Sequence, residues 1–220
     1  MVEPEEEVVK KSTIEEENKQ LGWFLLVILI VFAAVLIPYF WAESNKSFQY
    51  SQIDWFVESD ENPITYHGRF PSLGINDLNY NIFLREDPRK NKVPVVGNIS
   101  TFNFKNTGII TMTPEIDACR GELPRAMFDI SAFVRQGIGI KKLVAGSTDK
   151  DIANESQRVF ARCDNLPNRT IIVFGVGEQS IVQDEENPYC YYINIENCDD
   201  ISPVEKFMVQ SIKDSRTKIQ

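Results

Sequence analysis

The sequence predicts an α/β fold, with α+β as the alternative: one N-terminal transmembrane helix, then a single mixed-sheet domain with helices packed on it. Two observations predict this layout. Residues 21–42 form an uninterrupted apolar stretch, and the remaining chain changes from strand-like to strand–helix patterning. The expected parts are an acidic tail (1–20), a membrane helix (21–42) and an α/β domain (43–220), β-rich over 43–105 and α/β over 106–220.

The apolar stretch runs for 22 uncharged residues from Leu21 to Ala42. As a helix it spans about 33 Å, against about 30 Å for the hydrocarbon core of a bilayer. Trp23 lies near one edge, and Tyr39 and Trp41 near the other, as interfacial aromatic residues do. A cleaved signal peptide is the main alternative, but the acidic residues before the stretch and the bulky PYFW at its end argue against one. We therefore expect a permanent anchor.

Lysines near the two ends of this helix predict its orientation. Lys10, Lys11 and Lys19 precede it, whereas Lys46 is the only basic residue that follows it before Arg69. The flank of a membrane helix that carries the excess of Lys and Arg usually lies in the cytoplasm. We therefore expect a single-pass protein of the cell membrane, with its N-terminal tail in the cytoplasm and its domain outside.

Charge narrows the range of partners. The net charge is −9, and the tail, with seven acids and three lysines, accounts for −4 of it. A domain at −5 lacks the basic footprint that binds phosphate backbones, so we expect no nucleic-acid partner. The tail itself is expected to be a solvated spacer, with a short helix over VVKKSTIEEE as the alternative.

Four cysteines, all after the apolar stretch, predict two disulfides in an oxidising compartment. Four cysteines allow three pairings. We favour the one in which Cys190 and Cys198, which are close enough in sequence for a local loop, pair with each other and Cys119 pairs with Cys163. No CxxC motif is present, which disfavours zinc and thioredoxin-like chemistry. Four N-x-[ST] sequons give weaker support for an exported domain and are candidate glycosylation sites: Asn45, Asn98, Asn154 and Asn168.

The first half of the domain reads as β structure. Strands are expected at 48–59, 64–70, 78–86 and near 99–104. In the third of these, Tyr80, Ile82 and Leu84 alternate with residues expected on the opposite face.

The second half alternates strands and helices. We expect strands at 108–113 and 140–146, a helix over 124–136 closed by Gly137, and a helix from Asp149 or Asp151 to about Arg162. The apolar stripe of the first helix is Ala126, Ile130, Phe133 and Val134.

The end of the chain should contain an antiparallel run and a helix. The run comprises 170–176, 180–184 and 190–196, with GVGEQ (175–179) as a hairpin turn. SPVE (202–205) reads as a capping box that opens the last helix. The inward residues of that helix are expected to be Val204, Phe207, Met208 and Ile212.

Catalytic signatures are weak. His67 is the only histidine and no GxSxG accompanies it, which disfavours a serine-hydrolase group and most zinc sites. GVGEQ lacks the third glycine and the helix of a dinucleotide-binding loop. The sequence therefore predicts no cofactor, no metal and no catalytic residue.

Acidic residues surround the segment Cys190–Cys198. Their composition favours solvated turns, with a Ca²⁺ site or a pair of hydrolytic carboxylates as the alternatives. The acids in question are Asp184, Glu185, Glu186, Asp199 and Asp200. Trp55 and Phe56 are aromatic candidates for a contact patch, with packing inside the sheet as the alternative.

Three stretches carry a resemblance in layout: NIFLREDPRKNKVPVVG, TMTPEIDAC and CYYINIENC, which follow a single N-terminal anchor. Their succession resembles a recurring group of uncharacterised, membrane-anchored proteins of archaea. The resemblance covers about 130 residues and implies the architecture only.

These observations favour a membrane-anchored protein whose outer domain binds a protein partner, as an accessory or structural subunit of an envelope complex. The alternative is an envelope hydrolase that uses the acids near 184–200. A third possibility is that the tail recruits a cytoplasmic partner.

Overall fold

The computed structural model describes residues 5–44, 46–58, 63–100 and 103–217. The chain divides into two compact units, Met1–Ser47 and Phe48–Gln220, and the second unit is called the domain below. The mixed α/β content predicted from the sequence is confirmed: two sheets are present together with helices.

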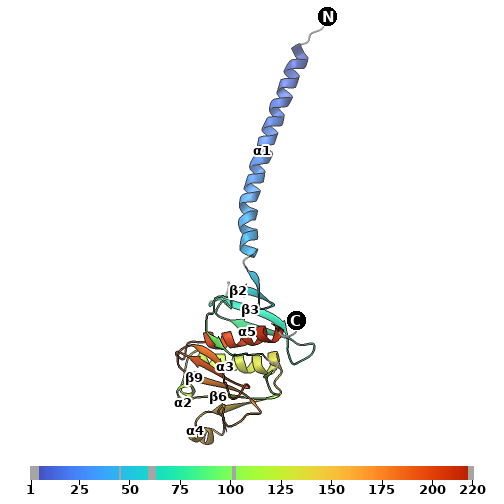
Figure 1. Cartoon of the computed structure of the whole chain (residues 1–220). Helices are drawn as coiled ribbons and strands as arrows, with labels where there is room; N and C mark the ends of the chain where they lie inside the picture. The colour runs from blue at the N-terminus through green and yellow to red at the C-terminus, as the bar shows by residue number, and fades with distance from the viewer. Residues whose placement is uncertain (1–4, 45, 59–62, 101–102, 218–220) are drawn as a thin grey trace. The chain divides into compact units, whose positions relative to one another are not determined.

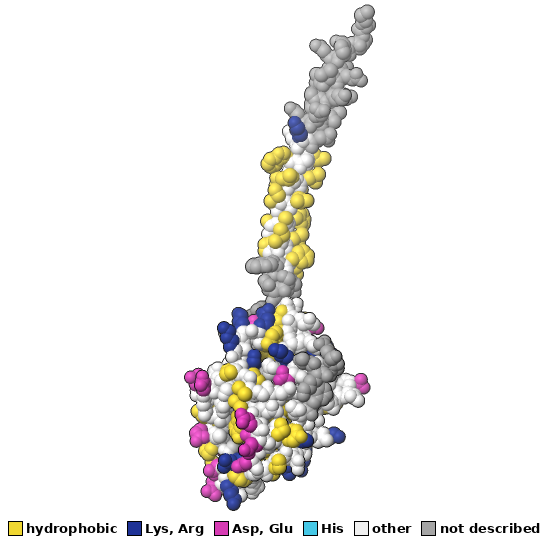
Figure 2. Space-filling model, in the orientation of Figure 1, with side chains coloured by type: hydrophobic (Ala, Val, Ile, Leu, Met, Phe, Trp, Pro, Cys, Tyr) yellow, Lys and Arg dark blue, Asp and Glu magenta, His cyan; other side chains and the backbone are white. Residues whose placement is uncertain are grey.

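One long helix, α1 (Glu5–Ser44), makes up most of the first unit. Its segment Lys19–Phe40 has a mean hydropathy of 2.9, is not buried, and is long and apolar enough to cross a membrane. Apolar side chains cover this segment in Figure 2. The tail residues continue the same helix from Glu5 onward, beyond the short alternative helix, because Glu, Lys and Gln are good helix formers.

The first half of the domain forms a four-stranded sheet. Its strands, in spatial order, are β1 (Ser47–Tyr50), β2 (Ile53–Glu58), β3 (Thr65–Pro71) and β4 (Asn79–Leu84). The pairs β2–β3 and β3–β4 are antiparallel. The predicted alternation in the third strand is confirmed, because Ile82 and Leu84 are buried whereas Phe83 is exposed.

The second half builds a seven-stranded sheet in the order β5-β10-β11-β9-β6-β7-β8. Five strands, from β11 to β8, run parallel, and β10 is antiparallel to β11. The bounds are β5 Val95–Val96, β6 Thr107–Met112, β7 Lys142–Ser147, β8 Val159–Phe160, β9 Thr170–Val176, β10 Ser180–Gln183 and β11 Cys190–Ile195.

The helices α3 and α5 lie between the two sheets, which gives the domain three layers (Figure 1). The helices are α2 (Pro114–Asp117), α3 (Leu123–Ala132), its π-helical continuation η2 (Phe133–Ile138), α4 (Lys150–Glu155) and α5 (Ser202–Thr217). One core cluster joins Trp55 of the small sheet, Phe133 and Phe207 of the helix layer, and Phe174 of the large sheet. The predicted inward stripes of α3 and α5 are confirmed, since their eight residues are all buried.

The far face of the large sheet carries no long helix among the described residues. A second, smaller cluster covers it, made of Cys163, Ile171, Val173 and Cys190, with Leu166 and Tyr192 packed alongside. A disulfide-linked loop therefore stands where many open α/β sheets have helices.

The predicted hairpin between residues 170 and 184 is wrong. β9 and β10 do not pair, because β11 lies between them, parallel to β9 and antiparallel to β10. The hairpin is instead β10–β11. Its turn is stabilised by Asp184, whose Oδ1 accepts the N–H groups of Glu186 (3.1 Å) and Asn187 (2.7 Å).

The helix ends also differ from prediction. The helix from residue 124 continues past Gly137 and ends at Gly139, whose φ of 92° requires glycine. The helix capped by Asp149 stops at Glu155, so the predicted extension to Arg162 is wrong.

The predicted strand near 99–104 is absent from the residues described there. Side chains take the N–H groups that a strand ladder would use: Asp214 accepts from Ile99, and Asn98 accepts from Ser100.

The predicted capping box is wrong too. Ser202 lies inside α5, its N–H is bound by Asp200, and Glu205 reaches away to the end of β4.

Candidate functional site

The acids near 184–200 are divided between the two ends of β11. Asp184 and Glu186 precede the strand, whereas Asp199 and Asp200 follow it. Six residues of strand separate them by about 20 Å. A carboxylate from one end and a carboxylate from the other are therefore too far apart for the pair that glycoside hydrolysis uses.

The acids that follow β11 also accept hydrogen bonds from neighbouring segments of the chain. Asp200 binds the N–H of Ser202 (3.2 Å) and the amide of Gln179 (2.8 Å), and Asp199 Oδ1 lies 3.4 Å from the N–H of Glu122. Among the described residues, no group of three or more His, Cys, Asp or Glu side chains is placed to hold a metal ion.

The two residues of the predicted contact patch, Trp55 and Phe56, lie on opposite faces of the small sheet. Trp55 is fully buried in the small sheet, and its Nε1 donates to the carbonyl of Tyr50 (3.1 Å), so this residue packs inside the sheet and does not contribute to a contact patch. Gly68 on the next strand leaves the space for this ring, because a Cβ there would lie 2.8 Å from it. Phe56 is exposed on the outer face of the sheet.

His67 lies on that same outer face. It is in register with Phe56 and Phe83 on the neighbouring strands, and it stacks on Phe83 at 4.5 Å. Its ring nitrogens contact Glu58 (3.3 Å) and Asn81 (3.3 Å). These contacts hold the ring beside that of Phe83, as in a cross-strand aromatic pair.

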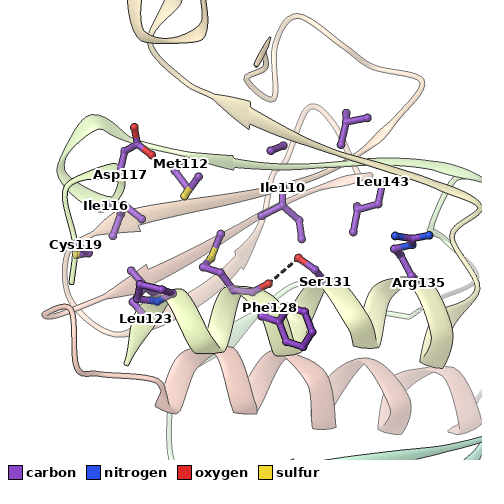
Figure 3. A pocket seen from close by; sticks show the side chains of 14 residues that line it. Ile110, Met112, Ile116, Asp117, Cys119, Leu123, Phe128, Ser131, Arg135 and Leu143 are labelled. Carbon is purple, nitrogen blue, oxygen red and sulfur yellow. Dashed lines mark hydrogen bonds between the residues drawn. The ribbon is translucent and has the colours of Figure 1, made fainter. Parts of the chain in front are cut away.

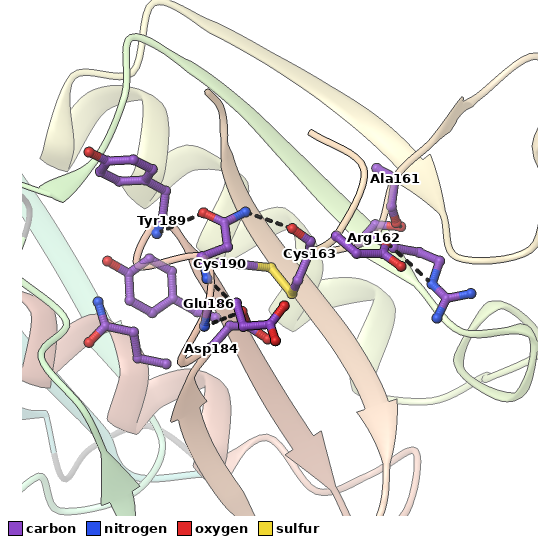
Figure 4. Close-up of a disulfide and its surroundings, with 12 residues drawn as sticks. Ala161, Arg162, Cys163, Asp184, Glu186, Tyr189 and Cys190 are labelled. Carbon is purple, nitrogen blue, oxygen red and sulfur yellow. Dashed lines mark hydrogen bonds and ion pairs between the residues drawn. A yellow bond between two sulfur atoms is a disulfide. The ribbon is translucent and has the colours of Figure 1, made fainter. Parts of the chain in front are cut away.

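All four cysteines form disulfides, but the pairing differs from the prediction. The bonds are Cys119–Cys198 and Cys163–Cys190. Cys190 and Cys198 cannot meet, since β11 and the turn after it carry them apart. Cys163–Cys190 fastens the loop after β8 to the start of β11 (Figure 4). Cys119–Cys198 joins the end of α2 to the segment before α5.

The sequons fall on the surface where they are described. Asn98, Asn154 and Asn168 are exposed, and Asn45 lies outside the described residues. Their use for glycosylation stays a prediction.

An apolar groove lies between α3 and strands β6 and β7, with a volume of about 470 Å³ (Figure 3). Its floor is formed by Ile110 and Met112 of β6 and by Leu143 and Ala145 of β7. Its walls are formed by Ile116, Cys119, Leu123, Pro124, Met127 and Phe128. This volume lies within the usual range for ligand pockets.

The groove exists because α3 packs against α5 and leaves β7 uncovered. Ile110 on β6 is 4% exposed, whereas the neighbouring Ala145 on β7 is exposed and Leu143 is half-buried. Phe128, which is 73% exposed, projects from α3 at the rim. An apolar side chain in this position gains little free energy within the chain itself and would gain more by contact with a partner.

Charges stand at the two ends of the groove. Figure 3 shows Asp117 at one end and Arg135 at the other. Asp117 is paired with Arg158, whereas no ion pair to Arg135 occurs among the described residues. The Ser131 hydroxyl donates to the carbonyl of Met127 within its own helix (2.6 Å). The groove is therefore an apolar surface with one uncompensated positive charge, and no nucleophile–base pair lines it.

Sequence reasoning missed this groove. The apolar stripe of 124–136 marks only the buried face of the helix, and Phe128 lies outside that stripe. Phe128 on the polar side of an amphipathic helix was the one available signal.

The comparisons with family models, with curated proteins and with solved structures found no match. The resemblance to archaeal proteins stays a prediction, and function is inferred from the geometry alone.

Proposed function

We propose that this protein is a single-pass membrane protein with a cytoplasmic N-terminus. Its extracytoplasmic domain binds an apolar segment of another envelope protein, as a non-catalytic accessory subunit. The apolar helix and the two disulfides indicate a membrane-anchored or secreted domain. The lysine asymmetry supports the orientation.

The observation that carries the binding role is the groove itself. It combines exposed Phe128, two adaptable methionine side chains and an uncovered strand, which are features of surfaces that accept peptide segments. Arg135 at one end favours a segment with an acidic residue at the corresponding end.

Site-specific photo-crosslinking in native membranes tests this role. A photoreactive phenylalanine analogue at position 128 should give one discrete adduct. The same analogue at Val176, which is also exposed but lies outside the groove, should give none.

Two further variants make the test specific. Ala145→Glu places a charge on the exposed floor of the groove and should abolish the adduct from position 128. Val176→Glu, the matched control, should leave it unchanged. Equal adducts from the two positions, or an adduct that survives Ala145→Glu, would refute the groove as the binding surface.

A further inference from the structure

A second cavity lies on the opposite face of the large sheet, where the chain reverses the direction in which strands are added. The strands β7 and β8 lie on one side of β6, whereas the later strands β9, β11 and β10 lie on its other side. In open α/β sheets, ligands bind outside the carboxyl ends of the strands at such a point. A crevice of about 680 Å³ occupies this place, lined by Thr113, Glu115, Thr148, Arg162, Gly175 and Asn194.

Arg162 is presented to this crevice by a rigid backbone. On one side of it, the Thr111 hydroxyl donates to the carbonyl of Ala161 (3.1 Å). On the other side, Cys163 is bonded to Cys190, and its carbonyl accepts from the buried Asn187 amide (2.8 Å; Figure 4).

The charge of Arg162 is barely used within the chain. Its Nε lies 3.8 Å from the exposed Asp164, and its side chain is 57% exposed. A guanidinium whose backbone is held in place and whose N–H donors are free is suited to bind a carboxylate in a bidentate manner.

An acidic group and an acceptor line the same crevice. Glu115 lies in the first turn of α2, and its exposed acidic side chain lines the crevice. Within the described structure, no ion pair joins Glu115 to Arg162. Asn194 donates its amide N–H to Ser180 (3.0 Å), which leaves its Oδ1 beside Gly175, where a Cβ would lie 3.2 Å from that oxygen.

We propose that this crevice binds a small zwitterion, an amino acid or a short peptide, with its carboxylate on Arg162 and its ammonium group on Glu115 and Asn194 Oδ1. Opposite charges that do not pair with each other match a ligand that carries both charges. This site is independent of the groove, because the two lie on opposite faces of the sheet.

Isothermal titration of the full chain in detergent micelles tests the proposal. The probes are the standard amino acids and glycylglycine, followed by the N-acetylated and C-amidated forms of whichever probe binds. Each blocked form removes one of the two ligand charges. We expect binding of at least one zwitterion and an affinity at least tenfold weaker for each blocked form.

Variants assign the charges to residues. Arg162→Ala and Glu115→Gln should each weaken binding at least tenfold, whereas Arg120→Ala, which removes an exposed arginine outside the crevice, should not. Because both substituted side chains are at the surface, circular dichroism should show an unchanged fold. Absence of binding by every probe, equal binding of the blocked forms, or full affinity in Arg162→Ala would each overturn the proposal.

Discussion

Glu205 is almost completely buried in the helix layer, with 5% of its surface exposed. Glutamate side chains are rarely buried to this extent. The two carboxylate oxygens of Glu205 accept the backbone N–H groups of Arg85 (2.6 Å) and Glu86 (3.0 Å). It thereby ties the first turn of α5 to the end of β4 and so joins the helix layer to the small sheet. Burial outweighs these hydrogen bonds and raises the pKa of Glu205 to about 7.

This raised pKa predicts a specific pH dependence of stability. Between pH 4.5, the ordinary pKa of Glu, and pH 7, the native state holds a proton on Glu205 that the unfolded state has lost. The free energy of unfolding should therefore fall as the pH rises through this window, by roughly 3 kcal/mol. Chemical denaturation at pH 5 and pH 8 measures it.

Glu205→Gln should remove that contribution, because its side chain is neutral at both pH values. The control is Glu155→Gln, which removes an exposed glutamate of α4. It should keep the pH dependence of the unmodified chain. An identical pH dependence in Glu205→Gln and the unmodified chain would show that Glu205 does not titrate in this range.

At the scale of elements, the sequence predicted which residues form and bury an element better than it predicted which elements and cysteines pair. Tyr80, Ile82 and Leu84 showed the two-residue period of β4, and Val204, Phe207 and Met208 showed the inward face of α5, because these signals arise from neighbouring residues. Neither the disulfides nor the position of β11 has such a signal. Cys190 and Cys198 are close in sequence, yet β11 directs them to different ends of the sheet.

The observed disulfides predict different losses of stability. The chain-entropy model gives about 3.5 kcal/mol for the bond that spans 27 residues (Cys163–Cys190) and about 4.5 kcal/mol for the one that spans 79 (Cys119–Cys198). Paired alanine variants of each bond, compared by equilibrium unfolding, measure these losses.

Peptide mapping without reduction provides the check on pairing. It should recover a fragment that joins Cys119 to Cys198 and a second that joins Cys163 to Cys190. A fragment with Cys190 joined to Cys198 would contradict this pairing.

At the scale of the molecule, the sequence predicted the order of parts well and the candidate site poorly. A long apolar helix has a strong local signal, because lipid requires continuous hydrophobicity. The groove has none, since it arises where a helix fails to cover β7. It depends on how α3 packs against α5, which no window of sequence contains.

The proposed topology predicts the pattern of protease sensitivity. Protease added to intact cells should remove the domain and leave a fragment that contains α1, because the domain is expected outside. A tag at the N-terminus should be degraded only after the membrane is permeabilised. Protection of the domain in intact cells would invert the orientation.

The central place of β11 has a consequence for synthesis. This strand joins β9 to β10, yet it leaves the ribosome after both of them. Until residue 190 has emerged, the nascent chain holds two thiols, Cys119 and Cys163, and the only bond they can make is one that the finished domain does not contain. Oxidation of these two thiols must therefore either be delayed until Cys190 has emerged or be followed by disulfide exchange.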